Sequence, residues 1–164
     1  MHLKCGGKNQ NKNYQLWINF SIFLTVLTLD RISKVLVLRF EQNLRLLPFL
    51  EIVLVKNKGI VFGLFSGGNI GNNMLTISSI ISVILITVIF CKFTNKTLIP
   101  ILSLIIGGAV GNILDRVLYG YVIDFIKIDS FYVFNIADAS ITIGSTCLVI
   151  YAIFYGREHK SIKS

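Results

Sequence analysis

Charge is scarce in this 164-residue chain: only 15% of the residues are Asp, Glu, Lys or Arg, whereas 54% are hydrophobic. The mean hydropathy is +0.72, and the few charges collect between long apolar runs. A chain that crosses a lipid bilayer must keep charge out of long segments, and a soluble domain need not. The composition therefore excludes an ordinary soluble protein and predicts a single membrane-embedded domain over residues 1–164.

Cysteine and histidine are also few, and neither is arranged as a site. Cys5, Cys91 and Cys147 lie far apart without paired spacing, which argues against a disulfide framework and against a zinc site. His2 and His159 lie in the polar termini, so the chain lacks the closely spaced histidine pair of a metallopeptidase. We therefore expect no metal and no other cofactor.

Acidic residues are outnumbered, because eight Asp and Glu stand against sixteen Lys and Arg and leave a net charge of +8. The basic residues lie at the ends of apolar segments rather than on one face interleaved with aromatic residues. This placement favours contact with anionic membrane lipid and argues against nucleic-acid binding.

Four apolar segments are long enough to cross a bilayer, which takes about 17–25 helical residues. The first follows a polar stretch, is too long for the apolar part of a cleaved signal sequence, and carries charge near its far end. In the third, Gly107 and Gly111 have a spacing that permits close helix packing. The sequence predicts an α-helical polytopic membrane protein with four transmembrane helices, at about 16–38, 74–91, 98–118 and 135–155.

The connections that follow the first and third spans predict strands. Leu46–Lys56 is rich in Val, Ile and Leu, which favours one or two strands over a membrane helix. Asn69–Asn73 indicates a turn before the second span. The alternation through Val122–Ile128 favours another short strand.

The orientation in the membrane does not follow from charge. Four spans put both termini on one side, where eight Lys and Arg lie, and the other eight lie on the far side. The positive-inside rule therefore gives no decision. Seven of the eight acidic residues lie on the far side, but acidic residues contribute little to topology.

Four aspartates lie at corresponding ends of the spans, where the first and third end and the fourth begins: Asp30, Asp115, Asp124 and Asp138. Ionisable groups beside hydrocarbon are costly, so they usually face a cavity and indicate a functional site. The alternative is a structural role, in ion pairs with neighbouring Arg31, Lys34 and Arg116.

Asp124 and Asp138 are the candidates for catalysis, because each lies in an apolar stretch. Two carboxyl groups close together in a medium of low dielectric cannot both ionise, so one can act as a general base while the other donates a proton. Two structural alternatives stay open. Asp138 can cap a helix whose N-cap is Asn135, and Asp124 can be a water-exposed acid on an edge strand.

Asn112, Asp115 and Arg116 can share one face of the third span, because they are three and four residues apart. A polar cluster at a cavity is one interpretation. We favour a structural role that supports the site, through an interhelical hydrogen bond of Asn112 and an Asp115–Arg116 network.

Five segments resemble motifs of the lipoprotein signal peptidase family, also called signal peptidase II, and they occur in the order of that family. They span residues 30 to 138 and are Asp30-Arg-Ile-Ser-Lys34, Asn57-Lys-Gly59, Gly107-Gly-Ala-Val-Gly-Asn-Ile-Leu-Asp-Arg116, Val122-Ile-Asp-Phe125 and Phe134-Asn-Ile-Ala-Asp138. One departure is Val61, which stands before Phe62 where the family usually has a small residue.

The resemblance implies four transmembrane helices with a small extracytoplasmic β-sheet, and a catalytic pair formed by Asp124 and Asp138. Positions expected to shape the site or contact the substrate are Asn57, Gly59, Asn112, Arg116 and Asn135. Positions expected to support it are Asp30, Lys34 and Asp115.

The resemblance also implies a substrate and a location. The expected substrate is a prolipoprotein whose signal-peptide Cys carries diacylglycerol, and cleavage is expected just before that Cys. The enzyme is expected in the bacterial inner membrane, with both termini cytoplasmic and the active site near the extracytoplasmic face. A monomer is the default expectation, and it does not rest on the resemblance. Two alternative functions stay open besides a peptidase. One is a proton-coupled transporter, which would show internal repeats, and the other is a non-catalytic assembly factor that packs through the glycines of the third span.

Overall fold

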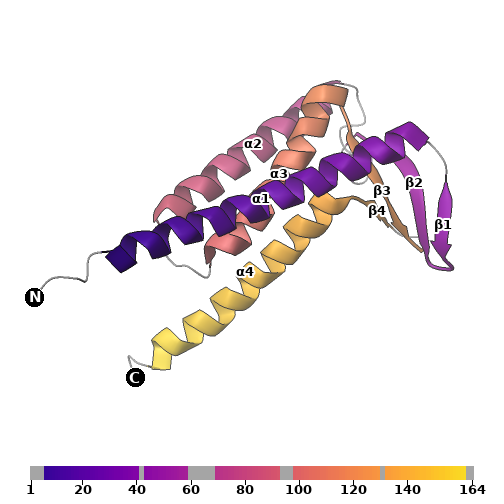
Figure 1. Cartoon of the computed structure of the whole chain (residues 1–164). Helices are drawn as coiled ribbons and strands as arrows, with labels where there is room; N and C mark the ends of the chain where they lie inside the picture. Colours follow the sequence, from indigo (N-terminus) through magenta and orange to yellow (C-terminus); the bar gives the residue numbers. More distant parts are fainter. Residues whose placement is uncertain (1–5, 41–42, 59–68, 93–97, 130–131, 162–164) are drawn as a thin grey trace, which may run out of the picture.

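The computed structural model describes residues 6–40, 43–58, 69–92, 98–129 and 132–161, which form four helices and four strands (Figure 1). The helices are α1 (Gly6–Phe40), α2 (Asn69–Lys92), α3 (Leu98–Tyr119) and α4 (Ile136–Ser161). The strands are β1 (Leu44–Leu47), β2 (Leu50–Asn57), β3 (Val122–Ile128) and β4 (Tyr132–Phe134).

Helix α3 is the centre of the bundle, because it contacts each of the other three helices. Its glycines permit this packing. A Cβ atom on Gly107 would lie 3.2 Å from the side chain of Val26 on α1, and one on Gly111 would lie 2.7 Å from the carboxylate of Asp30. Gly108 faces Ala137 and Ser140 of α4. The close packing predicted from the glycine spacing is confirmed.

Three of the described helices are long and apolar enough to cross a membrane, over Gly71–Val88, Leu98–Tyr119 and Ile136–Phe154. Helix α1 does not reach the same apolar character, because Gln15 and Asn19 interrupt one half of it and charged residues the other. Of the four predicted spans, the structure thus bears out three by length and composition. Within its window α3 is 39% buried and α2 is 6% buried, so α2 lies at the periphery.

The strands form one antiparallel sheet in the order β1-β2-β3-β4. The sheet lies at the end of the bundle where α1 and α3 end and where α2 and α4 begin, and the described chain ends lie at the opposite end (Figure 1). An irregularity in β2 between Ile52 and Val55 shifts the register against β3, so that Val55 pairs with Asp124. Asp124, the catalytic candidate on β3, is the third residue of that strand, which begins directly after α3. It therefore lies in the part of the sheet nearest the helices.

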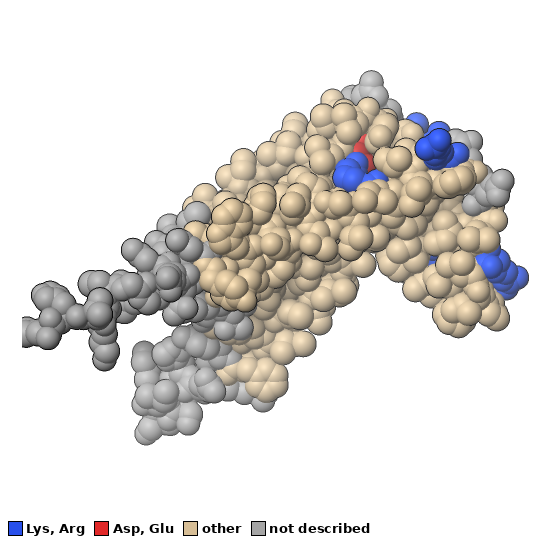
Figure 2. All heavy atoms as spheres, viewed as in Figure 1, with Lys and Arg blue, Asp and Glu red and all other residues tan. Residues whose placement is uncertain are grey.

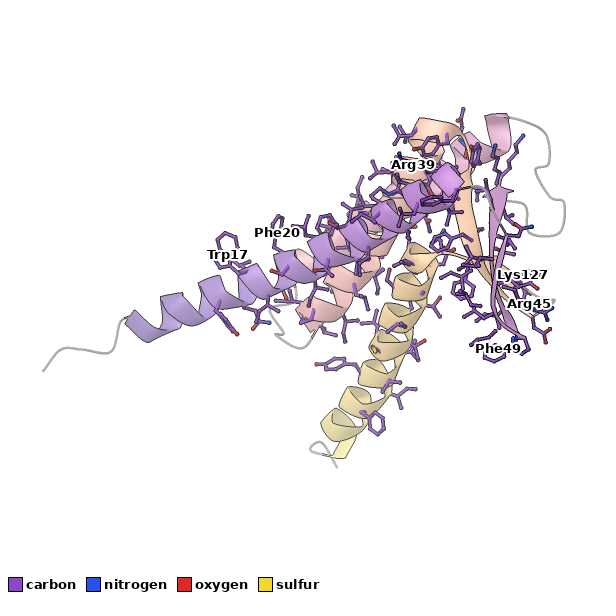
Figure 3. The ribbon with its side chains drawn as sticks, turned by 45° about the vertical axis from the view of Figure 1, so that its right-hand side comes forward. Trp17, Phe20, Arg39, Arg45, Phe49 and Lys127 are labelled. Atoms are coloured by element: carbon purple, nitrogen blue, oxygen red, sulfur yellow. The ribbon has the colours of Figure 1, made fainter. Side chains whose placement is uncertain are left out.

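The surface also differs between the helical bundle and the end that carries the sheet. On the face shown in Figure 2, the described helices are covered almost entirely by uncharged residues, and the visible Lys and Arg lie in the half of the molecule that carries the sheet. Figure 3 shows Arg45 and Lys127 at the far tip of the sheet and Arg39 at the adjoining end of α1. An uncharged helical body with a charged end suits a protein that lies in a bilayer with its sheet at the water interface.

Three features of the secondary structure differ from the sequence prediction. Helix α1 begins at Gly6, about ten residues before the predicted span. Strand β4 was not predicted, because three residues are too few for a pattern. The turn predicted at Asn69–Asn73 is wrong, since these residues form the start of α2. Asparagine favours both turns and helix N-termini, where N–H groups lack partners within the helix, so composition did not separate the two.

Candidate active site

A cluster of polar side chains is buried where α1, α3, α4 and β3 meet. Its fully or almost fully buried members are Asp30, Lys34, Asn112, Asp115, Asp124 and Asn135. Such groups are costly to bury unless they are paired or hydrogen-bonded, so the partners of each determine what the cluster can do.

Asp30 and Asp115 form ion pairs with two cations of α1. Lys34 Nζ lies 2.9 Å from Asp30 and 2.7 Å from Asp115, and Arg31 lies 2.8 Å and 2.7 Å from the same two carboxylates. Arg31 also donates a hydrogen bond to the carbonyl of Gly111, at 2.9 Å. Two anions and two cations balance in charge, which makes this part of the cluster a structural tie between α1 and α3.

The same two carboxylates hold the backbone beside each catalytic candidate. Asp30 accepts a hydrogen bond from the amide N–H of Ala137, at 3.1 Å, one residue before Asp138. Asp115 accepts one from the amide N–H of Ile123, also at 3.1 Å, one residue before Asp124. The ion-pair cluster therefore fixes the start of α4 and the start of β3 relative to each other.

Two asparagine side chains connect the ion pairs to the catalytic candidates. Asn112 Oδ1 accepts hydrogen bonds from Lys34 at 3.3 Å and from Asn135 Nδ2 at 3.1 Å. Its Nδ2 then donates to Asp138 Oδ1 at 2.8 Å. Because the ammonium of Lys34 can only donate, it determines which end of the Asn112 amide faces Asp138.

Asp124 is 2% exposed and accepts two hydrogen bonds, one at each oxygen. Asn135 Nδ2 donates to Oδ1 at 2.7 Å, and Asn57 Nδ2 donates to Oδ2 at 2.8 Å. The pKa of Asp124 is raised to about 6, chiefly by burial and in part by the charge of Asp138, against the lowering effect of the two hydrogen bonds and of Lys34. Asp124 therefore takes up a proton far more readily than an ordinary aspartate.

Asp138 is half-buried in the first turn of α4 and forms a capping box with Asn135. Its amide N–H donates to Asn135 Oδ1 at 2.8 Å, and its Oδ2 accepts from the amide N–H of Asn135 at 3.3 Å. The capping interpretation of Asp138 is thus correct in geometry. It does not exclude a chemical role, because Oδ1 is held by Asn112 and the side chain is less enclosed than that of Asp124.

Arg116 is half-buried on α3, near enough to Asp124 and Asp138 to interact with both electrostatically. Among the described residues it forms no ion pair, and Asp115 pairs instead with Arg31 and Lys34. The predicted Asp115–Arg116 network therefore holds only as an electrostatic interaction, without an ion pair between the two residues in the described part of the chain. The guanidinium is left to face the two catalytic candidates from one side.

The arrangement offers two carboxyl groups, a fixed set of amide donors and one cation, which suits acid–base chemistry with an activated water. Within the described ranges, no group of three or more His, Cys, Asp and Glu is placed to hold a metal ion.

Residues 22–154 match the family model described as signal peptidase (SPase) II. The chain belongs to the signal peptidase II family. Among its relatives, the lipoprotein signal peptidase of Pelagibacter ubique is 37% identical, and the match covers 93% of this chain and 96% of the relative. That of Caulobacter vibrioides is 39% identical, with 89% of this chain and 92% of the relative covered.

Two solved structures described as bacterial membrane enzymes are also similar to this signal peptidase II family member. One has a TM-score of 0.72 at 31% identity and covers 87% of this chain and 90% of the other. The second has a TM-score of 0.70 at 32% identity and covers 80% and 90%. The family resemblance predicted from the motifs is confirmed, and it places the chain among membrane peptidases.

The structure brings together nearly all the residues that the signal peptidase II motifs singled out. Hydrogen bonds or ion pairs join Asp30, Lys34, Asn57, Asn112, Asp115, Asp124, Asn135 and Asp138. Arg116 joins them through electrostatic interaction. Gly59 and Val61 lie outside the described residues. The roles assigned to these side chains stay predictions.

One member of the cluster was missed as a supporting residue. Arg31 was named as an ion-pair partner for the four aspartates but not as a site residue, yet it contacts Asp115 and the carbonyl of Gly111 on another helix. Its position next to Asp30, at the level of the third span's glycines, was the available signal. Sequence spacing alone did not say which residues of α1 face α3.

Proposed function

We propose that this chain is a membrane aspartyl endopeptidase that removes the signal peptide from diacylglyceryl-modified prolipoproteins and cleaves just before the lipidated Cys. The family match and the relatives' name, lipoprotein signal peptidase, support the substrate class. One structural observation carries the mechanism. Asp124 and Asp138 are joined through the side-chain amides of Asn135 and Asn112, at the end of an apolar bundle.

In the proposed mechanism the two carboxyl groups share one proton at rest, and Asp124 holds it because its pKa is raised to about 6 by burial. Asp138, the less enclosed of the two, takes a proton from water as the hydroxyl attacks the scissile carbonyl. Asp124 donates its proton to the carbonyl oxygen. When the tetrahedral intermediate collapses, Asp138 passes its proton to the leaving amine and the C–N bond breaks, while Asp124 takes back a proton from one hydroxyl group of the intermediate, which restores the resting pair.

The surrounding side chains support this proton transfer because they fix the orientation of the two carboxyl groups. Asn57 and Asn135 donate to different oxygens of Asp124, and Asn112 donates to Asp138, so neither carboxyl group can rotate freely. Arg116 carries a positive charge that no ion pair with a described residue neutralises. We assign it to the substrate carbonyl, where negative charge develops. Gly59 is proposed to shape the same site.

The proposed orientation rests on the resemblance to the signal peptidase II family. Helix α1 crosses the membrane as a fourth span, because it lies against α3 along the bundle. Four spans put both termini on one side, which we assign to the cytoplasm, so that the sheet with the catalytic pair lies at the extracytoplasmic face. There an apolar signal helix and its lipid can reach the site from the bilayer, while water reaches it from outside. All the site residues come from one chain, so one copy suffices for catalysis.

The test is cleavage of a diacylglyceryl-modified prolipoprotein by the purified protein in detergent. Asp124→Asn and Asp138→Asn should each abolish cleavage, because each removes one of the two proton-transfer groups. The matched control is Asp129→Asn. Asp129 is an exposed aspartate at the end of β3 with φ of 51°, a conformation that asparagine adopts readily.

All variants are compared at equal amounts of folded protein, measured by gel filtration in detergent. Full activity of Asp129→Asn with loss of activity in both other variants supports the aspartyl mechanism. Cleavage by Asp124→Asn or Asp138→Asn would refute it. If those two substitutions lower abundance but leave the specific activity intact, the aspartates are structural.

A further inference from the structure

The outer part of the β-sheet has one charged face and one apolar face. Glu51 on β2 is paired across the strands with Arg45 on β1 and with Lys127 on β3, so the three charged side chains form one row. Opposite residues of paired strands share a face, and successive residues of a strand alternate between faces. The positions on either side of the charged row therefore point the other way, and they are apolar: Leu44, Ile52, Ile126 and Phe134 in one row and Leu50, Ile128 and Tyr132 in the next.

The apolar face is turned toward the helices. Its first row takes part in a groove of about 300 Å³ between the sheet and the end of α1. The apolar walls of the groove are Leu36, Val37 and Phe40 from α1 and Leu44 and Ile52 from the sheet. The charged row points the other way, since Figure 3 shows Arg45 and Lys127 on the side of the sheet that faces away from the bundle.

The sheet extends sideways from the end of the bundle. In Figure 1 the strands run crosswise to the helices and reach past the side of the bundle. In Figure 2 the outer part of the sheet stands beside the helical body as a separate lobe. Helices α2, α3 and α4 are long and apolar enough to cross a membrane, so the space beside them belongs to the bilayer. The apolar face of the sheet is thus the face that meets the membrane surface.

We propose that the apolar face of the outer sheet is a membrane-binding surface. Its side chains lie among the headgroups and upper acyl chains of the leaflet beside the bundle, and the charged row stays in water. The occupant of the groove between α1 and the sheet is then membrane lipid. This contact depends on the spans and the sheet alone, so a failure of the proposed peptidase reaction would leave it in place.

The exposed residues of this face favour lipid over a protein partner. Phe40 and Leu44 are 64% and 56% exposed and lie on opposite walls of the groove, so the apolar surface of the helices continues onto the sheet. Tyr132 on the edge strand β4 is 78% exposed. Tyrosine, with an apolar ring and a polar hydroxyl, is enriched where a membrane meets water. Lipid already surrounds the helices at this level and covers the whole face without an additional partner.

The membrane contact extends toward the catalytic candidate on β3. Asp124, Ile126 and Ile128 alternate along the strand and therefore share a face. The two isoleucines lie farther out than Asp124, which is almost fully buried against the helices. Lipid bound at the outer sheet thus supports the strand that carries Asp124 from the side of the membrane.

Nitroxide labels on neighbouring residues of β1 test the contact. In a variant whose three native cysteines are replaced by Ser, Leu44→Cys and Arg45→Cys are labelled and reconstituted in vesicles of phosphatidylcholine and phosphatidylglycerol. The two positions are a matched pair, because they are adjacent, are 56% and 66% exposed, and point to opposite faces. Oxygen, which concentrates in hydrocarbon, should relax the label at position 44 more than a water-soluble nickel chelate does. The order should reverse at position 45.

Two results would overturn the proposal. Faster relaxation by the nickel chelate at both positions would mean that the sheet stands clear of the membrane. Protection of the label at position 44 from both probes would mean that protein covers the apolar face, as a second copy or a bound peptide would.

Because a nitroxide can disturb the face it reports, tryptophan fluorescence gives a second measurement. Trp17, the one tryptophan of the chain, is replaced by Phe, and Tyr132→Trp or Arg45→Trp is introduced. Lipids brominated on the upper acyl carbons should quench Tyr132→Trp and leave Arg45→Trp nearly unquenched. Both variants are taken from the folded peak of gel filtration before reconstitution. Equal quenching of the two, or none in Tyr132→Trp, would contradict a lipid contact at the apolar face.

Discussion

At the scale of single residues, four aspartates that look alike in the sequence have different interaction partners in the structure. Asp30 and Asp115 are neutralised by Arg31 and Lys34 and hold backbone amides. Asp124 and Asp138 have only amide donors as hydrogen-bond partners among the described residues. Their apolar contexts predicted this division in part. The amide links could not be predicted, because they join residues as many as 67 positions apart.

The hydrogen bond from Asn57 predicts a pH effect. It lowers the pKa of Asp124, which burial raises to about 6. If Asp124 must be protonated for cleavage, kcat falls as the pH rises through this pKa. Asn57→Ala removes the lowering effect, so Asp124 should stay protonated to higher pH and the alkaline limb should move up by about one pH unit.

The measurement is kcat against pH for the parent, Asn57→Ala and Asn73→Ala, a control that removes an exposed amide at the start of α2. The control should leave the limb in place. An alkaline limb that stays in place, with an acid limb that moves to higher pH in Asn57→Ala, would mean that Asp124 works as the ionised base, and the roles of the two carboxyl groups would have to be exchanged.

Lys34 predicts a large effect on stability. It is 1% exposed and pairs with both Asp30 and Asp115. Lys34→Met leaves two buried carboxylates with Arg31 as their one ion-pair partner, which should cost about 3–5 kcal/mol in the free energy of unfolding. Arg45→Ala is the comparison, because Arg45 is 66% exposed and lies 3.8 Å from Glu51. It should cost less than about 1 kcal/mol.

Unfolding in mixed detergent micelles, followed by circular dichroism, gives both values. Similar small losses in the two variants would show that the buried carboxylates take up protons when Lys34 is absent. The ion-pair cluster would then contribute little to holding α1 against α3.

At the scale of elements, apolar length and glycine spacing predicted α2, α3 and α4, because a bilayer imposes a simple rule on span composition. The ends were harder to predict. Helix α1 continues through a polar stretch down to Gly6, where helical hydrogen bonds persist although the side chains are not apolar. The strand pairing also lay beyond the sequence, since the irregularity in β2 that brings Val55 opposite Asp124 has no signature in composition.

The packing of α3 predicts that Gly111 tolerates no side chain. A methyl group there would lie 2.7 Å from Asp30 Oδ2 and 3.4 Å from Ala137. Gly111→Ala should push Asp30 off the amide of Ala137, displace the start of α4 and reduce cleavage at least tenfold, because small misplacements of reacting groups are costly.

Gly120→Ala is the matched comparison, measured in the same cleavage assay. A Cβ at Gly120 meets no atom within 4 Å, but the positive φ of 76° makes the change unfavourable by about 1 kcal/mol. It should lower stability and leave cleavage nearly intact. If Gly120→Ala harms cleavage as much as Gly111→Ala, general loss of stability explains both and close packing at Asp30 does not.

At the scale of the whole molecule, the sheet and the ion-pair cluster occupy one end of the bundle, and the described start of α1 and end of α4 occupy the other (Figure 1). This polarity allows a sharp test of the orientation that charge counting left undecided. Cys5, which precedes the described start of α1 in the sequence, is the probe for the terminal side, and Arg45→Cys is the probe for the tip of the sheet (Figure 3). Each is made the one cysteine of a variant, with the other cysteines replaced by Ser.

A maleimide that cannot cross membranes should label Arg45→Cys on intact cells stripped of their outer barrier, because the sheet is proposed to face outward. Cys5 should react only after the membrane is permeabilised. Both variants must retain cleavage activity for the comparison to count. Labelling of Cys5 on intact cells, with Arg45→Cys protected, would invert the topology and place the catalytic pair on the cytoplasmic side, where no translocated signal-peptide junction could reach it.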